Sequence, residues 1–338
     1  MSENSTDATP SLLDLVRPLD AGAHVTACAF LGAVAAFALG DGGVLLWKGG
    51  ESHRVEAHPD GSVLSAACDG ERLVTGGDDG RVAVTGPDGS TRTFAQAAAF
   101  SWIDALALHR EGGIAWSSGR TVTARDPKGK ERTLSTPSSV RGLAFAPKGY
   151  RLAVAHVDGA TLWFPNLDGA PERLEWKGAH LDVVWSPDGR FVVTSMQENS
   201  LHGWRLQPDK GHMRMSGYPG KSRSLSWTHD GKWLATSGAD AVILWPFDSK
   251  EGPTGKQPRE CGVRPAQVSR VACHPRAPVV AAGFQDGAVL LIRLSDASEL
   301  LVRPAVKGSG ITALAWDDRG ATLAFGAADG AGGVLVLP

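Results

Sequence analysis

The chain has 338 residues, of which 42% are hydrophobic and 21% are charged, and its formal net charge is only -2. A chain this apolar and this weakly charged can bury enough surface to fold, which excludes disorder as the state of the whole chain. The 34 lysines and arginines are balanced by 36 aspartates and glutamates. We therefore do not expect a nucleic-acid partner, which would require a basic surface.

The beginning of the chain and its apolar runs give no sign of export or of a membrane span. Residues 1–10 are polar and lack the basic start and apolar centre of a signal peptide, so we expect a disordered tail. The longest apolar run, residues 25–39, is shorter than the roughly 18 to 20 residues that cross a bilayer. The four cysteines contain no Cys-X-X-Cys pair, which favours a reducing compartment. We expect a cytoplasmic protein with no membrane contact.

A six-residue pattern recurs eight times along the rest of the chain. Its third and fifth positions are small and its fourth and sixth are apolar in most copies. The starting positions run from 25 to 311, which is 286 residues over seven intervals, or about 41 residues per interval. The copies begin at Val25, Val63, Ile103, Val140, His180, Ser222, Val268 and Ile311. We expect each copy to form the inner strand of one repeat.

The same succession of turns and apolar segments follows each copy. First comes a turn rich in Pro, Asp and Gly, as in SPDG at residues 186–189, which provides the backbone angles of a short hairpin. A second apolar segment, a break rich in Gly and Asp, a third apolar segment and a more polar fourth segment complete the unit. The third segment ends in tryptophan at Trp47, Trp163, Trp204 and Trp245. Because no segment has a convincing helical period, the unit predicts a four-stranded antiparallel meander.

The period, the SPDG-type turn and the tryptophan that ends the third strand resemble the WD-repeat β-propeller family, over residues 12–338. The motifs are degenerate, because no Trp-Asp dipeptide follows a third strand. The family's network of His, Ser/Thr, Asp and Trp is complete in no unit; the first has His24, Asp41 and Trp47 but no hydroxyl in its second strand. The resemblance implies an all-β propeller with a scaffold or adaptor role, and eight units imply eight blades.

The two ends of the chain indicate how the ring closes. The sequence LVRP occurs at residues 15–18 and again at 301–304, in both cases seven positions before an inner-strand start. The second copy belongs to an outer strand, so the first should as well. The chain ends in a third strand with no fourth strand after it. We therefore expect residues 12–19 to complete the last blade, so that residues 11–338 form a single propeller domain without exposed sheet edges.

Enzyme signatures are absent from the sequence. It contains no Gly-rich phosphate loop, no Gly-X-Ser-X-Gly elbow, no His-Glu-X-X-His motif and no Cys/His cluster with zinc spacing. The Gly-Gly-Asp-Asp-Gly run at residues 76–80 falls in register on a turn between strands. We expect a noncatalytic protein without a cofactor, and we keep a hydrolase or lyase that uses a central pocket as the rival interpretation.

A comparison of equivalent positions in the eight inner strands identifies the candidate binding residues. Asp182 and Arg270 break the rule of a small third position, and His180 replaces the usual β-branched first residue. Charged residues at the second position, the residues just before it and the ends of second strands should meet at the mouth of the ring, together with His156 and Met196. The candidate partner-binding residues are Trp102, Asp104, Arg141, His180, Asp182, Lys221, Arg223, Arg270 and Phe284.

Two interpretations of this cluster remain open. In one, Asp182 pairs with Arg270 or Arg223 and forms a local ion network without a partner. In the other, which we favour, the mouth binds a protein or peptide, because Arg and Trp at a concave centre are typical of binding hot spots. We expect the protein to act as a monomer and to bind one or more proteins or peptides.

A metal site is a further alternative for the same mouth. His156, His180 and His202 fall near one face of the fourth and fifth units, and three ligands from adjacent loops could bind zinc. No pair of these histidines has a local ligand-spacing motif. We therefore name no metal ligand and keep a metal-binding or ligand-binding propeller as the alternative to a scaffold.

Overall fold

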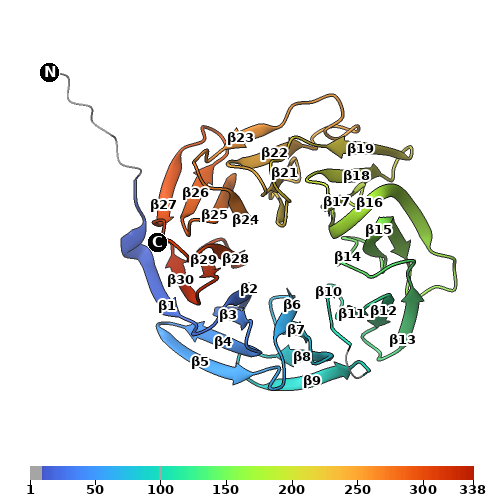
Figure 1. Cartoon of the computed structure of the whole chain (residues 1–338), viewed down its shortest axis with the longest axis horizontal. Helices are drawn as coiled ribbons and strands as arrows, with labels where there is room; N and C mark the ends of the chain where they lie inside the picture. Colours follow the sequence, from blue (N-terminus) through green and yellow to red (C-terminus); the bar gives the residue numbers. More distant parts are fainter. Residues whose placement is uncertain (1–9, 99–100) are drawn as a thin grey trace.

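A computed structural model describes residues 10–98 and 101–338 of the chain, which form a ring of antiparallel sheets around a central channel (Figure 1). The predicted tail at residues 1–10 lies outside the described residues except for Pro10. The one helix of the described residues is a single 3-10 turn, η1 (Leu13–Leu15). No helix in this part of the chain is long and apolar enough to cross a membrane.

Three four-stranded sheets begin the ring, each with its strands in sequence order from the channel outward. The first contains β2 (Val25–Leu31), β3 (Val34–Leu39), β4 (Gly43–Lys48) and β5 (Glu51–Glu56). The second contains β6 (Val63–Cys68), β7 (Leu73–Gly77), β8 (Arg81–Thr85) and β9 (Thr91–Gln96). The third contains β10 (Ala105–Leu108), β11 (Ile114–Ser118), β12 (Thr121–Arg125) and β13 (Glu131–Ser135).

A six-stranded sheet follows, and three more four-stranded sheets complete the ring. The six-stranded sheet contains β14 (Gly142–Phe145), β15 (Leu152–Trp163), β16 (Glu172–Trp185), β17 (Phe191–Met196), β18 (Leu201–Arg205) and β19 (Gly211–Met215). The next contains β20 (Leu225–Trp227), β21 (Trp233–Thr236), β22 (Val242–Pro246) and β23 (Arg259–Cys261). The sixth contains β24 (Val268–Cys273), β25 (Val279–Phe284), β26 (Val289–Arg293) and β27 (Glu299–Arg303). The last contains β28 (Ile311–Trp316), β29 (Thr322–Ala327), β30 (Ala331–Val336) and β1 (Val16–Asp20).

The prediction of eight separate blades is wrong, because the described chain forms seven sheets. The fourth and fifth repeats share the six-stranded sheet. Its strand β16 is continuous: residues 172–179 pair with β15, and residues 180–185 pair with β17. In other sheets an irregular link joins the outer strand of one repeat to the inner strand of the next, but here the strand continues through a bend at Gly178, whose φ of 128° lies in the region that favours glycine. Counted as continuous sheets, the propeller therefore has seven blades, and β16 lines the channel with its second half.

The observed inner strands lie close to the predicted starts. Strands β2, β6, β24 and β28 begin at the predicted positions, whereas β10, β14 and β20 begin at Ala105, Gly142 and Leu225 instead of 103, 140 and 222. The fifth predicted start, His180, lies inside β16. Adjacent inner strands contact one another around the channel, as β2 does with both β6 and β28.

Neighbouring sheets are held together by shared apolar layers. One core cluster joins Val242 and Leu244 of β22 to Val280 and Leu290 of the next sheet. Another joins the first sheet to the last, with Phe37 packed in the same cluster as Val334. Because each sheet buries both of its faces in this way, the hydrophobic stabilisation extends around the whole ring.

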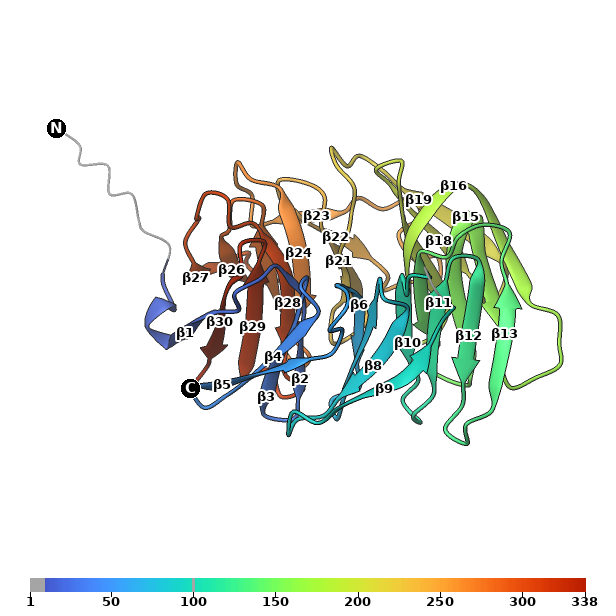
Figure 2. The same ribbon diagram turned by 60° about the horizontal axis from the view of Figure 1, so that its bottom comes forward.

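The predicted closure of the last blade by the N-terminal strand is confirmed. Strand β1 pairs antiparallel with β30, in a register that places Val16 opposite Leu335 and Asp20 opposite Ala331. The two strands run side by side at the edge of the ring in Figure 2. The residues before β1 add two backbone bonds to β27: the Leu12 amide donates to the Leu301 carbonyl, and the Leu301 amide donates to the Pro10 carbonyl, each at 2.8 Å.

Two buried hydrogen-bond networks retain parts of the family motif. In the second sheet the His58 ring lies 3.0 Å from Asp79 through Nδ1 and 2.9 Å from Thr75 through Nε2. In the sheet of β20–β23, the Trp245 indole donates to the Tyr218 hydroxyl at 2.6 Å, and that hydroxyl lies 2.6 Å from Thr236 Oγ1. Tyr218 thus links the side chains of Trp245 and Thr236. The hydrogen bonds of both networks satisfy polar groups that are buried within the apolar layers.

We predict that Leu19→Asp destabilises the ring by about 2–3 kcal/mol, because it places a carboxylate against the apolar cluster shared by the first and last sheets. Urea denaturation followed by tryptophan fluorescence measures the change. Arg17→Asp, at an exposed position on the same strand, should change the free energy of unfolding by less than about 0.5 kcal/mol. Equal effects of the two variants would contradict the role assigned to the Leu19 side chain.

Candidate functional site

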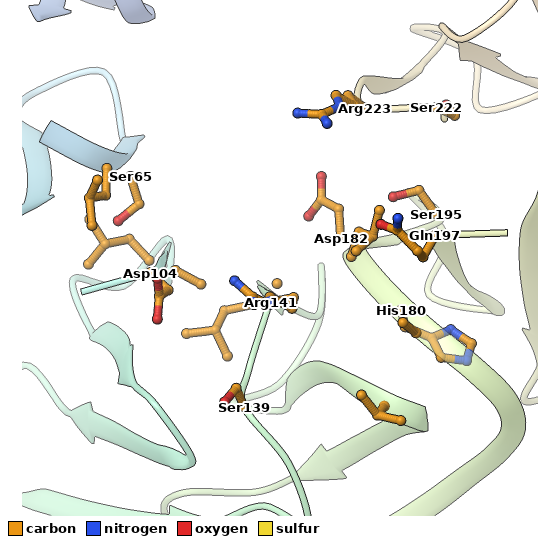
Figure 3. A pocket seen from close by; sticks show the side chains of 18 of the residues that line it. Ser65, Asp104, Ser139, Arg141, His180, Asp182, Ser195, Gln197, Ser222 and Arg223 are labelled. Carbon is orange, nitrogen blue, oxygen red and sulfur yellow. The ribbon is translucent and has the colours of Figure 1, made fainter. Parts of the chain in front are cut away.

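A cavity of about 910 Å³ occupies the channel, and charged side chains from several sheets line it (Figure 3). Asp104 and Arg141 lie just before β10 and β14, and Asp182 lies on the inner half of β16. The other two charged residues that line the cavity are Arg223, just before β20, and Arg270 on β24. Each of these five charged residues occupies the second or third position of the six-residue pattern. Because the inner strands share a common register, the five side chains lie at one level of the channel.

The cavity opens at the end of the ring where the inner strands begin. Ser138 and Ser139, in the link before β14, contribute to its wall, as does Ala179 in β16. Val157 of β15 and Gln197, the residue after β17, line it as well. Loops that precede inner strands and loops that follow second strands lie at the same end of a meander, so these residues define the mouth of the channel.

The charged side chains of the cavity are not paired with one another. None of the five forms an ion pair within 4.0 Å among residues 10–98 and 101–338. Arg270 instead donates to backbone carbonyls, from Nε to Thr312 at 2.5 Å and from Nη1 to Ser269 at 3.0 Å. The direct pairing of Asp182 with Arg270 or Arg223, one of the two sequence interpretations, is therefore not present.

Burial makes these charges costly. It raises the pKa of Asp182 to about 6, an effect that the Val183 amide, donating to Oδ1 at 2.8 Å, and the Arg270 charge only partly offset. Burial likewise raises the pKa of Asp104 against the opposing effect of Arg141. Burial and, after it, the charge of Arg223 lower the pKa of Arg270. Partly buried charges without direct partners cost stability, which favours their use in binding.

Two serine hydroxyls in the cavity wall lack hydrogen-bond partners. Ser195 and Ser222 both line the cavity, and each is only 1% exposed. Neither hydroxyl oxygen has a partner among the described residues. A buried hydroxyl without a partner is unfavourable by roughly 1–3 kcal/mol, and because both oxygens are covered by surrounding protein atoms, they are not accessible to a ligand in the cavity.

Six of the nine candidate residues line the cavity: Asp104, Arg141, His180, Asp182, Arg223 and Arg270. Trp102 does not, but it lies two residues before Asp104 and is 59% exposed. Lys221 is half-buried and is not part of the wall. Phe284 is placed wrongly by the sequence analysis, because its side chain is fully buried in the core between two sheets.

The error at Phe284 has a simple geometric cause. His156 and Met196, which were also expected at the mouth, are 1% and 2% exposed. In the fourth and fifth repeats the next residue along, Val157 or Gln197, faces the cavity instead. Successive side chains of a strand point to opposite faces, so the last buried residue of a second strand and the residue after it face different surroundings. That alternation could have identified Val157 and Gln197 from the sequence.

The candidate metal ligands are occupied by other interactions. His156 contacts the Val157 carbonyl and Thr161 Oγ1, each at 2.8 Å. His180 contacts Thr194 Oγ1 at 2.7 Å and the Trp176 carbonyl at 2.9 Å. Burial lowers the pKa of both rings, which keeps them neutral. In the described part of the chain, no group of three His, Cys, Asp or Glu side chains is placed to hold a metal ion.

His202, the third of these histidines, has a different environment. Its ring is fully buried and stacks on Trp176, with centroids 3.9 Å apart. Burial, and next the charge of His212, lower its pKa to about 3. The ring therefore acts as a neutral aromatic spacer between strands of the six-stranded sheet.

The chain matches known repeats in two places. Residues 49–84 and 211–245 match the family model described as WD domain, G-beta repeat. Each match begins at or near the outer strand of one repeat, β5 or β19, and extends through the third strand of the next. The matched unit therefore crosses from one blade to its neighbour.

One curated protein, from two strains, and one solved structure are similar to this chain. Protein HIR1 of Cryptococcus neoformans var. neoformans serotype D is 24% identical over 222 residues in each of two strains. The match covers 55% of this chain and 25% of the length of that protein. The crystal structure of the computationally designed Ika8 protein superposes with a TM-score of 0.74 at 20% identity, covering 94% of this chain and 98% of the designed one. This last likeness concerns the fold alone.

We predict that Asp182→Asn stabilises the protein at neutral pH. The folded state keeps a proton on Asp182 up to about pH 6, whereas the unfolded chain loses it near 3.8, so wild-type stability falls as the pH rises through this window. The asparagine variant lacks this loss. Its free energy of unfolding should exceed that of the wild type by about 3 kcal/mol at pH 7.5 and nearly match it at pH 4. Urea titrations across this range test the prediction, and a difference that does not change with pH would contradict it.

Proposed function

Because this chain belongs to the WD40 repeat family, we propose that it is a noncatalytic scaffold that binds a protein or peptide at the mouth of its channel. WD40 domains generally bind proteins. The family alone does not specify where a partner binds, since one fold carries many functions. The location comes from the side chains of the channel.

The observation that carries the proposal is the set of charged side chains around the cavity that have no ion-pair partner. Arg141 and Arg223 are exposed, and their guanidinium groups make no hydrogen bond to any described residue. Arginine is among the residues that contribute most to protein interfaces, because its planar group offers several donors and stacks well. A ligand that enters the mouth would meet these groups first.

Exposed apolar side chains lie on the same face of the ring as the mouth, and two of them line the cavity. Leu64 and Val157, both lining the cavity, are 38% and 45% exposed, and Trp102 is close to it in sequence. Val263 and Val306 are also exposed, and each lies in a loop that precedes an inner strand. These loops share one face of the ring. Apolar groups gathered around a polar centre are typical of protein-binding surfaces.

The side chains of the cavity are less suited to catalysis than to binding a partner. Neither Ser195 nor Ser222 is hydrogen-bonded to a histidine in the described chain, and both nitrogens of His180 are already engaged. A serine nucleophile needs a base within hydrogen-bond reach. These contacts support the binding role over the hydrolase that was the rival interpretation.

Affinity capture with charge-reversed bait tests the proposal. The double variant Arg141→Glu/Arg223→Glu, and separately Trp102→Ala, should capture the proteins retained by the wild type at least about tenfold less from a lysate of the source organism. The matched control is Arg110→Glu/Arg319→Glu, which makes the same charge change at two exposed positions in turns at the opposite ends of inner strands. Equal capture by the wild type, the mouth variants and the control would overturn the proposal.

A further inference from the structure

We propose that the ligand of the channel is an acidic peptide segment, whose anionic side chains bind Arg141 and Arg223 at the mouth. This inference rests on the proposed binding function and adds the chemical class of the partner. Three features of the cavity support it: the accessibility of its arginines, its charge balance and its apolar rim.

Two of the three arginines of the cavity are more accessible than its aspartates, whereas the third, Arg270, is half-buried as the aspartates are. Arg141 and Arg223 are exposed, whereas Asp104 and Asp182 are half-buried. In Figure 3 the side chain of Arg223 extends into the open centre of the channel, above Asp182. One oxygen of Asp182 already accepts the Val183 amide. A cationic ligand would therefore meet exposed guanidinium groups and half-buried carboxylates, of which that of Asp182 is already partly occupied.

The net charge of the cavity is positive. Three arginines face two aspartates, which leaves a charge of +1 when both aspartates are ionised. His180, the only histidine that the described residues contribute to the cavity wall, is neutral because burial lowers its pKa. An acidic segment is thus attracted into the channel, and two exposed guanidinium groups can each bind a carboxylate or phosphate in a bidentate way.

The rim of the cavity favours a peptide over a free anion or a nucleic acid. Leu64 and Val157 present apolar surface beside the arginines, so the ligand should combine acidic with apolar side chains. The whole chain has a net charge of -2, which gives a polyanion no extended basic surface.

Selection from a random peptide library displayed on phage, with the full chain as target, tests the inference. Counter-selection uses the variant Arg141→Glu/Arg223→Glu, and Arg110→Glu/Arg319→Glu is the matched control. Enriched peptides should carry a net negative charge and at least one apolar residue. Fluorescence anisotropy of one enriched peptide should give at least about tenfold weaker binding to the mouth variant and unchanged binding to the control.

Variants of the enriched peptide then separate the possible outcomes. Glu→Gln or Asp→Asn replacement in the peptide should weaken binding at least about tenfold. A second peptide, with phosphoserine in place of the acidic residue, determines whether a carboxylate or a phosphate binds more tightly. Neutral or basic peptides that are lost with the mouth variant would overturn the acidic ligand but keep the proposed function. Peptides that bind all variants equally, or no enrichment, would overturn both. Displacement of the peptide by a single-stranded RNA 12-mer that binds more tightly would overturn the inference in favour of a nucleic acid.

Discussion

The pairing of β1 with β30 is the interaction on which the rest of the structure depends. It joins residues 16–20 to the end of the chain through five register pairs, and residues 10–12 extend the seam onto β27. Each sheet is stabilised by apolar layers on both faces, so an open arc would leave the first and last sheets with uncovered surfaces, including the cluster of Phe37 and Val334. Closure also fixes the width of the channel, because the inner strands must then form a complete ring.

The closed ring explains why the cavity contains charges that nothing neutralises directly. Inner strands approach closely, and a Cβ added to Gly142 would lie 2.8 Å from the Cα of Asp182. With the backbones held this near, a long or charged residue at the third position of an inner strand is directed into the channel. Asp182 and Arg270 are such residues, and the first bears a raised pKa as a consequence. The fold thus stabilises an arrangement that is locally unfavourable, which is common where a protein is shaped for a ligand.

Much of this could be predicted from the sequence, because the features involved depend on periodicity. The repeat located the inner strands, the paired LVRP segments located the closure, and the register identified five charged residues that meet in the cavity. The continuity of β16 could not be predicted from the alternation of apolar and polar residues. That alternation is the same whether one strand ends and a second begins or a single strand bends through a glycine such as Gly178. Phe284 was expected at the mouth, but successive residues of a strand face opposite sides and its side chain lies on the buried side. Tyr218 was missed because its role depends on contacts with Thr236 and Trp245, which are distant from it in sequence.

The most direct test of the account is hydrogen–deuterium exchange of the free protein and of Leu19→Asp. If closure determines the geometry of the whole ring, opening the seam should speed exchange in β14 and in the inner half of β16, which lie across the ring from β1 and β30 (Figure 1). Faster exchange confined to β1, β30 and the strands next to them would show that the channel is held without the closure and would contradict the account.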